Sequence, residues 1–262
     1  MQATTSSETS APKLSFRGVK KGFDGVDGWN PALDDFNLDI YEGEFVCIVG
    51  PSGCGKTTAL NLAAGFMQPD GGSLTLNGKP ILKPGPDRAM VFQEHALFPW
   101  LNVEQNIQLG LRLAGKPEKE RAVITNFYLK LVHLERFRNS FVHQLSGGMK
   151  QRVQLSRALA LAPSVLLMDE PFAALDAMTR DFLYVELQQI LAATKQTVLF
   201  VTHNIREAAI LGDRVIVMGD AHPGRIKAVF NVDLPRPRAF ESPGVIEIAS
   251  KTLELLRSEF NA

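Results

Sequence analysis

Short runs of apolar residues recur along the chain, each bounded by glycine, proline or polar residues. Unbroken apolar runs are typical of parallel strands that helices cover on both faces. Between the later runs, apolar residues return at helical spacing, so the pattern predicts a doubly wound α/β sheet. The predicted strands are 45–49, 88–92, 165–168, 197–201 and 214–218, and the long helix before strand 197–201 is expected to bury Met178, Phe182, Leu187, Ile190 and Leu191.

The N-terminal part of the chain alternates apolar and polar positions instead. Residues 14–19 and 36–40 show this alternation, and we expect them to form an antiparallel pair of strands beside strand 45–49. Three glycines and one proline within 22–31 predict a loop between them. Serine and threonine dominate residues 1–12, which predicts a disordered tail.

A strand at 73–76 is followed by the hairpin signal Asn77-Gly78. Residues 94–162 then read as mostly helical, with Asn102 as a capping residue and Lys116-Pro117-Glu118 as a turn between two helices. Asp176 can cap the long helix that follows strand 165–168. With further helices at 205–211 and 245–260, the predicted organisation is a tail at 1–12, an α/β domain at 13–233 with a helical subdomain at 94–162, and a C-terminal tail at 234–262.

Composition narrows the class of protein. The 262 residues contain 28 Lys and Arg against 28 Asp and Glu, so the charge balance predicts no nucleic-acid partner. The two cysteines, Cys47 and Cys54, fall on a predicted buried strand and in a glycine-rich loop, which fits a reducing compartment without a disulfide. No apolar run is long enough to span a bilayer, and the start lacks a secretory signal, so we expect a soluble, unsecreted protein.

The residues that connect strand 45–49 to the next helix have the spacing G-x-x-x-x-G-K-[ST] of a P-loop. Glycines let backbone N–H groups approach phosphates closely, and the helix N-terminus adds partial positive charge. We expect Lys56 to reach the β- and γ-phosphates and the Thr57 hydroxyl to complete the shell of Mg²⁺. The predicted nucleotide-binding residues are Gly50, Pro51, Ser52, Gly53, Cys54, Gly55, Lys56, Thr57 and Thr58.

Asp169 and Glu170 follow strand 165–168 at its carboxyl end, where open parallel sheets bind ligands. We assign Asp169 to Mg²⁺ and Glu170 to the attacking water as a general base. Two acids in this position are more often a helix cap or a solvated loop, but the P-loop upstream favours the functional interpretation. The histidines His95, His133, His143 and His222 show no metal-ligand spacing and are interpreted as surface or packing residues.

A second candidate phosphate site is the start of the helix after Leu145. Ser146, Gly147 and Gly148 precede an apolar-faced helix, which is a helix start suited to phosphate. A capped helix with a glycine turn would have the same residues. Physical reasoning alone therefore favours neither the phosphate site nor the purely structural helix start.

With these motifs in order, the chain from about Leu14 to Met218 resembles the ATP-binding cassette ATPases, in which Leu-Ser-Gly-Gly is the signature sequence. The resemblance implies a P-loop NTPase core, with a mostly parallel sheet flanked by helices, an antiparallel β subdomain and a helical subdomain insertion. It also implies that two subunits sandwich two ATP molecules head to tail, the signature of each closing on the γ-phosphate held by the other.

Further roles are implied at matching positions. Gln93 looks like the Q-loop glutamine, near the γ-phosphate and Mg²⁺, and His203 like the switch histidine that contacts the γ-phosphate and supports Glu170. The residues implied to face the partner's nucleotide are Ser146, Gly147, Gly148, Gln151 and Asp176. Ala173 stands where the family usually has Ser or Gly. Without the resemblance, His203 would be read as a structural histidine.

An aromatic residue should stack on the adenine. Phe23 is the first candidate, but the loop after it, with Val26 and Trp29, departs from the family pattern, so Trp29 and a core role for Phe23 both stay open.

The stretch 95–101 is unusually apolar for a loop. It can be a hydrophobic staple within the helical subdomain, or a groove for a membrane permease with Phe98 and Trp100 as anchors. Since no membrane span is predicted, the permease subunits would be separate chains, as in bacterial importers of this family. The chain would then act at the cytoplasmic face of the plasma membrane.

Three segments narrow the resemblance to the nitrate, sulfonate, taurine and bicarbonate branch of importers. They are 91–94 with 98–103, the signature variant with Met149, and 234–238. The resemblance implies a small anion as substrate and, indirectly, a solute-binding protein as a further partner. An ATPase of an exporter or lipoprotein-release system and a non-transport soluble ATPase are the alternatives.

Overall fold

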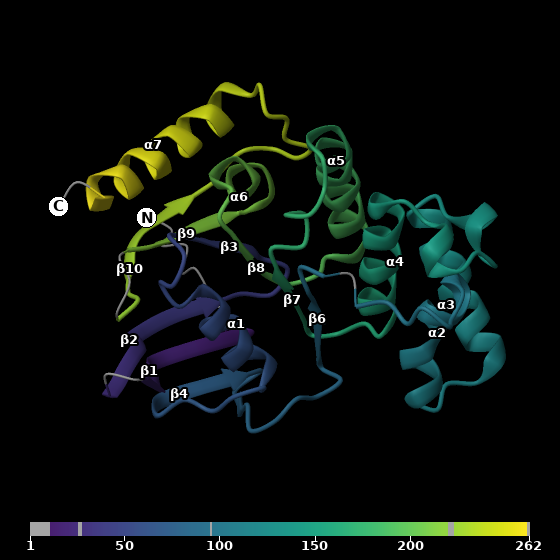
Figure 1. The fold of residues 1–262 in the computed structure, drawn as a ribbon, viewed down its shortest axis with the longest axis horizontal. Helices are drawn as coiled ribbons and strands as arrows, with labels where there is room; N and C mark the ends of the chain where they lie inside the picture. The colour runs from purple at the N-terminus through teal and green to yellow at the C-terminus, as the bar shows by residue number, and fades with distance from the viewer. Residues whose placement is uncertain (1–10, 26–27, 95, 220–222, 261–262) are drawn as a thin grey trace, which may run out of the picture.

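The computed structural model describes residues 11–25, 28–94, 96–219 and 223–260, which form two β-sheets surrounded by helices (Figure 1). Residues 1–10 of the predicted tail, together with Val26, His95 and His222, lie outside the described residues. No helix in the described ranges is both long and apolar enough to cross a membrane.

The larger sheet has the strand order β10-β9-β3-β8-β7-β6. All neighbours pair in parallel except β10, which runs antiparallel to β9 at the edge. This confirms the predicted parallel core, and it adds β10, which the sequence reading missed. The bounds are β3 Phe45–Val49, β6 Arg88–Val91, β7 Val165–Asp169, β8 Val198–Thr202, β9 Arg214–Met218 and β10 Ile226–Asn231.

Alternate residues of β3 face two different hydrophobic cores. Phe45, Cys47 and Val49 pack with the helices of the C-terminal half, whereas Val46 and Ile48 pack with α1 (Lys56–Ala64) and the second sheet. Burial on both faces explains why the strand has no polar position. The carboxyl ends of β3, β7 and β8 therefore emerge between two packed layers.

The second sheet is antiparallel, with the order β2-β1-β4-β5. The predicted loop at 22–31 is wrong, because β1 and β2 extend as a paired hairpin as far as Gly25 and Gly28. Gly22 is suited to this hairpin because it has no side chain: the Trp29 ring lies against it, and a β-carbon would come within 2.5 Å of the ring. The strands are β1 Leu14–Gly25, β2 Gly28–Ile40, β4 Gly71–Leu76 and β5 Lys79–Pro80.

Figure 1 shows the predicted helical stretch as a unit at the far end from the antiparallel sheet, joined to the core through α4. Asn102 caps α2 as predicted, accepting from the backbone N–H of Gln105 at 2.8 Å. The unit consists of α2 Val103–Leu113, α3 Glu118–Leu131, two short 3-10 helices η1 Glu135–Phe137 and η2 Val142–Gln144, and α4 Gly147–Ala160.

Helix α5 (Ala177–Thr194) is capped by Asp176 as predicted, but its buried stripe is not the predicted one. Leu187, Ile190 and Leu191 are buried, whereas Met178 and Phe182 are exposed by 85% and 54%. The first turn of α5 projects from the core, and the guanidinium of Arg152 lies over the Phe182 ring, 5.1 Å from its centroid. Leu183 and Tyr184 complete the buried stripe instead.

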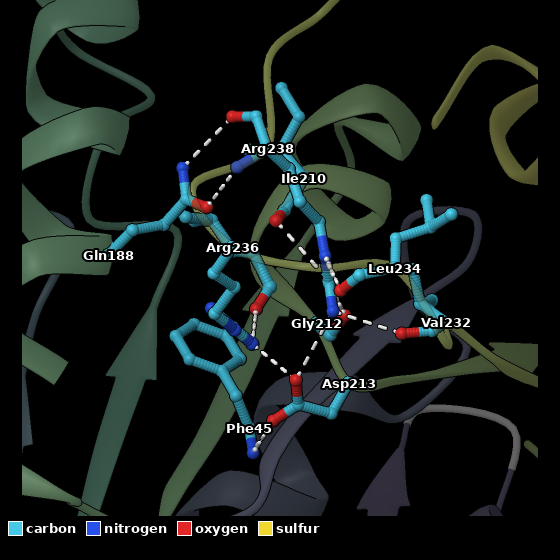
Figure 2. Close-up of polar contacts among 10 residues, drawn as sticks. Phe45, Gln188, Ile210, Gly212, Asp213, Val232, Leu234, Arg236 and Arg238 are labelled. Atoms are coloured by element: carbon cyan, nitrogen blue, oxygen red, sulfur yellow. Dashed lines mark hydrogen bonds and ion pairs between the residues drawn. The ribbon is translucent and has the colours of Figure 1, made fainter. Parts of the chain in front are cut away.

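The C-terminal helix α7 (Pro243–Phe260) packs against α6 (Ile205–Leu211). The chain between β10 and α7 is held by two arginines, as Figure 2 shows. Arg236 donates to the Leu211 carbonyl at 2.6 Å, and the buried Arg238 donates to the carbonyls of Ile210 and Gly212. These carbonyls lie at the end of α6, where cations are favourable, so the arginines hold the C-terminal segment against α6.

Candidate functional site

The glycine-rich loop joins β3 to α1 at the carboxyl edge of the parallel sheet. Gly53 and Gly55 have φ angles of +86° and +91°, a region that favours glycine. A β-carbon at Gly55 would lie 2.7 Å from the Ala32 carbonyl oxygen. Backbone N–H groups thus line a cradle that residues with a side chain at these two positions would distort. The cradle fits the phosphates of a nucleotide.

Lys56 is buried at the base of this cradle, with 6% of its surface exposed. Its ammonium donates to the carbonyls of Gly50 at 2.9 Å and Pro51 at 2.7 Å. A lysine ammonium has three N–H donors, and the third faces only the Cys54 Sγ atom at 3.8 Å, a weak acceptor that an anion can replace. These contacts fix the position of the positive charge.

Asp169 lies at the end of β7, with its Oδ1 atom 3.4 Å from the Thr57 hydroxyl. Burial raises the pKa of Asp169, and the charge of Glu170 raises it further. The Thr57 hydroxyl and the Asp169 carboxylate are oxygen ligands of the kind that Mg²⁺ prefers. A bound Mg²⁺ would also relieve the repulsion between Asp169 and Glu170. Gln93 follows β6, the strand beside β7, and is exposed at the same edge.

No cluster of three or more His, Cys, Asp or Glu residues suited to a metal occurs in the described part of the chain.

Glu170 and His203 come together across the ends of β7 and β8. The Nδ1 atom of His203 lies 2.7 Å from Oε2 of Glu170. Glu170 has a φ angle of +42°, a costly conformation for a residue with a side chain, and its N–H donates to the Val201 carbonyl at 2.9 Å. The backbone is thus held in a strained position that directs the carboxylate toward His203.

The predicted second phosphate site is an exposed helix start. Ser146 caps α4 by accepting from the N–H of Met149 at 3.3 Å. Gly148 packs so closely on α5 that a β-carbon would lie 2.8 Å from the methyl group of Thr179, which places the Ser146 loop beside the Asp176 loop. Gln151, by contrast, is 1% exposed, so its side chain does not lie on this surface.

The two candidate adenine-stacking residues lie on the β1–β2 hairpin. Phe23 pairs with Asn30 and Trp29 with Asp24, so the two rings occupy opposite faces of the hairpin. Their exposed fractions are similar, 45% for Phe23 and 58% for Trp29. The exposure of Phe23 argues against a core role, but neither ring is favoured over the other for stacking.

The apolar loop before α2 divides between core and surface. Leu97 packs against the core of the helical subdomain, as a staple would, whereas Trp100 is 69% exposed beside Phe98. Asn106 fixes this loop, since its side-chain amide accepts from the N–H of Phe98 and donates to the carbonyls of Phe98 and Leu101. The sequence reading missed Asn106, although a polar residue on the apolar stripe of α2 was a usable signal.

Comparison with known proteins gives a family and several relatives. The family model described as "ABC transporter" matches residues 33–173. A putative ATP-binding protein of Brucella abortus is 51% identical over 87% of this chain and 85% of its own length. In Synechococcus elongatus, the nitrate import ATP-binding protein NrtD is 42% identical over 94% of this chain and 92% of its own, and the bicarbonate transport ATP-binding protein CmpD is 40% identical over 95% and 92%.

Solved structures share the fold. The ATP-binding cassette MJ0796, seen as a dimer in a post-hydrolysis state bound to ADP and Pi, is 32% identical with a TM-score of 0.72. The match covers 85% of this chain and 100% of that one.

Proposed function

The chain belongs to the ABC transporter family of ATP-binding proteins, and from that premise we propose that it is the ATP-hydrolysing subunit of an importer for a small anion. The observation that carries the proposal is the contact between Glu170 and His203 at the sheet edge that also holds the P-loop lysine. This contact supplies an acid–base pair beside a phosphate cradle.

The residues of one chain divide the work of hydrolysis. The P-loop would bind the triphosphate, with Lys56 neutralising charge at the β- and γ-phosphates. Glu170 would accept a proton from the attacking water, and the nearby His203 would orient Glu170 and contact the γ-phosphate. Thr57, Asp169 and Gln93 would hold Mg²⁺, which supplies charge neutralisation at the phosphates when bound.

The exposed start of α4 supports a head-to-tail dimer. Ser146 and Gly147 present a helix N-terminus to solvent, and Asp176 lies in the neighbouring loop. We infer that these residues face the nucleotide of a second subunit, since helix starts favour phosphate. Gln151 would instead stabilise α4 from within, because it is buried.

The exposed Trp100 and its neighbour Phe98 support a docking surface for a separate permease on the helical subdomain. ATP-driven closure of the dimer would then move the permease from the cytoplasmic side of the membrane. Nitrate or bicarbonate relatives at 40–42% identity favour a small anion as the cargo, delivered by a solute-binding protein.

Substitution of the base tests the hydrolysis step. Glu170→Gln should bind ATP with nearly unchanged affinity, because the amide keeps the shape of the side chain, and should lower kcat by about 100-fold or more. Glu254→Gln, an exposed position on α7, is the matched control and should hydrolyse ATP at the wild-type rate. Normal hydrolysis by Glu170→Gln would remove Glu170 as the base.

Purification from gently solubilised membranes tests the transport step. We expect an integral permease to copurify with the tagged protein, and its solute-binding protein to bind nitrate, bicarbonate, taurine or an alkanesulfonate in titrations. Recovery of an export or lipoprotein-release complex, or of ribosomal proteins without a permease, would overturn the importer assignment and leave the ATPase assignment standing.

A further inference from the structure

A buried carboxylate, Glu207, lies on α6 just beyond the turn that carries His203. Only 4% of Glu207 is exposed, and none of the roles assigned above uses it. Burial raises its pKa to about 7, while the hydroxyls of Thr202 and Tyr184 and the charges of Arg180 and His203 act in the opposite direction. A carboxyl group kept this close to its titration midpoint is costly to bury.

Glu207 is tied to both residues that flank His203. The Thr202 hydroxyl donates to Oε2 of Glu207 and also accepts from the N–H of Asn204 at 3.0 Å. The Asn204 side chain in turn accepts from the N–H of Glu207 at 3.3 Å. The backbone on either side of His203 is therefore fixed by hydrogen bonds that meet at one residue.

The other side of Glu207 faces α5. Arg180 and Tyr184 lie on this helix, and Arg180 donates to the Leu175 carbonyl, next to Asp176, at 2.7 Å. A cavity of about 30 Å³ is lined by Glu207, Arg180, His203 and Glu170 among others. Its size suits a single water molecule. Glu207 thus lies between the turn that carries His203 and the helix that follows the Asp176 loop.

We propose that Glu207 is a positioning residue for ATP hydrolysis, which holds His203 against Glu170 through Thr202 and Asn204. This inference rests on the proposed function, since it requires that Glu170 and His203 act on ATP. If Glu207 only filled space, an apolar side chain would serve as well. Glu207 instead supplies the acceptor that the Thr202 hydroxyl needs to keep its orientation.

Titration of Glu207 should make kcat depend on pH. The titratable groups that face Glu207 are Arg180 and Tyr184 from α5, Glu170 from the end of β7, His203 from the turn and the thiol of Cys47 from β3. Protonation of Glu207 as the pH falls through 7 replaces the charge-assisted hydrogen bond from Thr202 by a weaker neutral one, so it should loosen the turn and lower kcat. The other five groups are retained in a Glu207→Gln variant, so their titration contributes to both rates and is largely removed in the ratio of the two rates.

The test compares the steady-state ATPase rates of wild-type and Glu207→Gln full-length protein from pH 6 to 8.5. We expect kcat of the variant to fall by about 10-fold at pH 8, with KM for ATP within about twofold, because an amide cannot match the carboxylate as an acceptor. The ratio of wild-type to variant kcat should rise with pH across 7. Glu44→Gln changes a half-buried carboxyl whose pKa is also raised, in the turn before β3 at the opposite end of the sheet from His203; it is the matched control and should leave kcat unchanged.

A second variant, Thr202→Val, removes the hydroxyl that joins Glu207 to Asn204 and keeps the shape of the strand. Thr202→Val should lower kcat by a similar factor. Because both residues act through the same hydrogen bond, the double variant should be no slower than either single variant. If Glu207→Gln does not fold, the rate of Thr202→Val decides the case. Wild-type kcat in both variants, or a loss confined to KM, would overturn the inference. If wild-type protein hydrolyses no ATP, alone or with its permease, the proposed function fails instead.

Discussion

The molecule has two helix starts with phosphate-binding character, and they are built in different ways. Helix α1 has no side-chain cap, because Gly55 precedes it in a left-handed conformation, and the Lys56 ammonium is buried against the loop carbonyls. Helix α4 is capped by the Ser146 hydroxyl and begins at the surface. The first start has a buried cation fixed at its base, whereas the second offers backbone N–H groups and a hydroxyl, with Lys150 following in the first turn.

This difference indicates a division of labour. A site with a fixed ammonium can bind a nucleotide by itself, since charge-assisted hydrogen bonds to phosphate are strong. A capped and exposed helix start has a weaker field and needs a phosphate already held elsewhere. The P-loop should therefore determine affinity, and the α4 start should determine turnover once two chains meet.

Removal of the Lys56 ammonium should have the largest effect. Lys56→Ala should weaken ATP binding by about 100-fold, because a charge-assisted hydrogen bond to the phosphates, worth up to about 3 kcal/mol, is lost. Lys150→Ala, in the first turn of α4, is the matched control and should leave the Kd of the isolated chain unchanged. Titration with a fluorescent ATP analogue measures both, and equal losses in the two variants would erase the distinction between the helix starts.

A bulky charge at the other start should affect turnover alone. Ser146→Arg should leave ATP binding to the isolated chain within about twofold and lower hydrolysis by more than about 10-fold, because the exposed surface could no longer close on a second subunit. Ser146→Ala, which removes only the cap, should cost about 1 kcal/mol of unfolding free energy and keep most activity. Rates should be measured against protein concentration with the permease present, and normal hydrolysis by Ser146→Arg would exclude a site shared between chains.

The sequence predicted the buried strands well, because burial on both faces leaves an unbroken apolar run. The edge strand β10 was missed, since only alternate residues are partly covered and its pattern is weak. The error at 22–31 has a different cause. Gly22 signals a loop in sequence, but in the structure it makes room for the ring of Trp29 across the hairpin.

Contiguous motifs made the P-loop and the Asp169-Glu170 pair predictable, because their spacing along the chain determines their geometry. The roles suggested for Asn106 and Glu207 depend on contacts that only the tertiary fold creates, and sequence reasoning did not find them. A single acid between Ile205 and Leu211, in a helix that is apolar after Glu207, was the available signal for this residue.

The smallest effect is expected at Cys54, the residue before Gly55 in the P-loop. Burial raises the pKa of this thiol above its ordinary value, although the nearby Lys56 acts to lower it. A thiol with a raised pKa is mostly protonated at pH 7, so alkylation by iodoacetamide should be at least about 10-fold slower than in the unfolded chain and should accelerate only at higher pH. Cys54→Ser should bind ATP within about twofold of wild type, because the side chain faces inward and the phosphate cradle is formed by backbone groups. Rapid alkylation at pH 7 that blocks ATP binding would instead show that the start of α1 stabilises a thiolate. The positive charge at this helix start would then act on the Cys54 thiol as well as on the nucleotide.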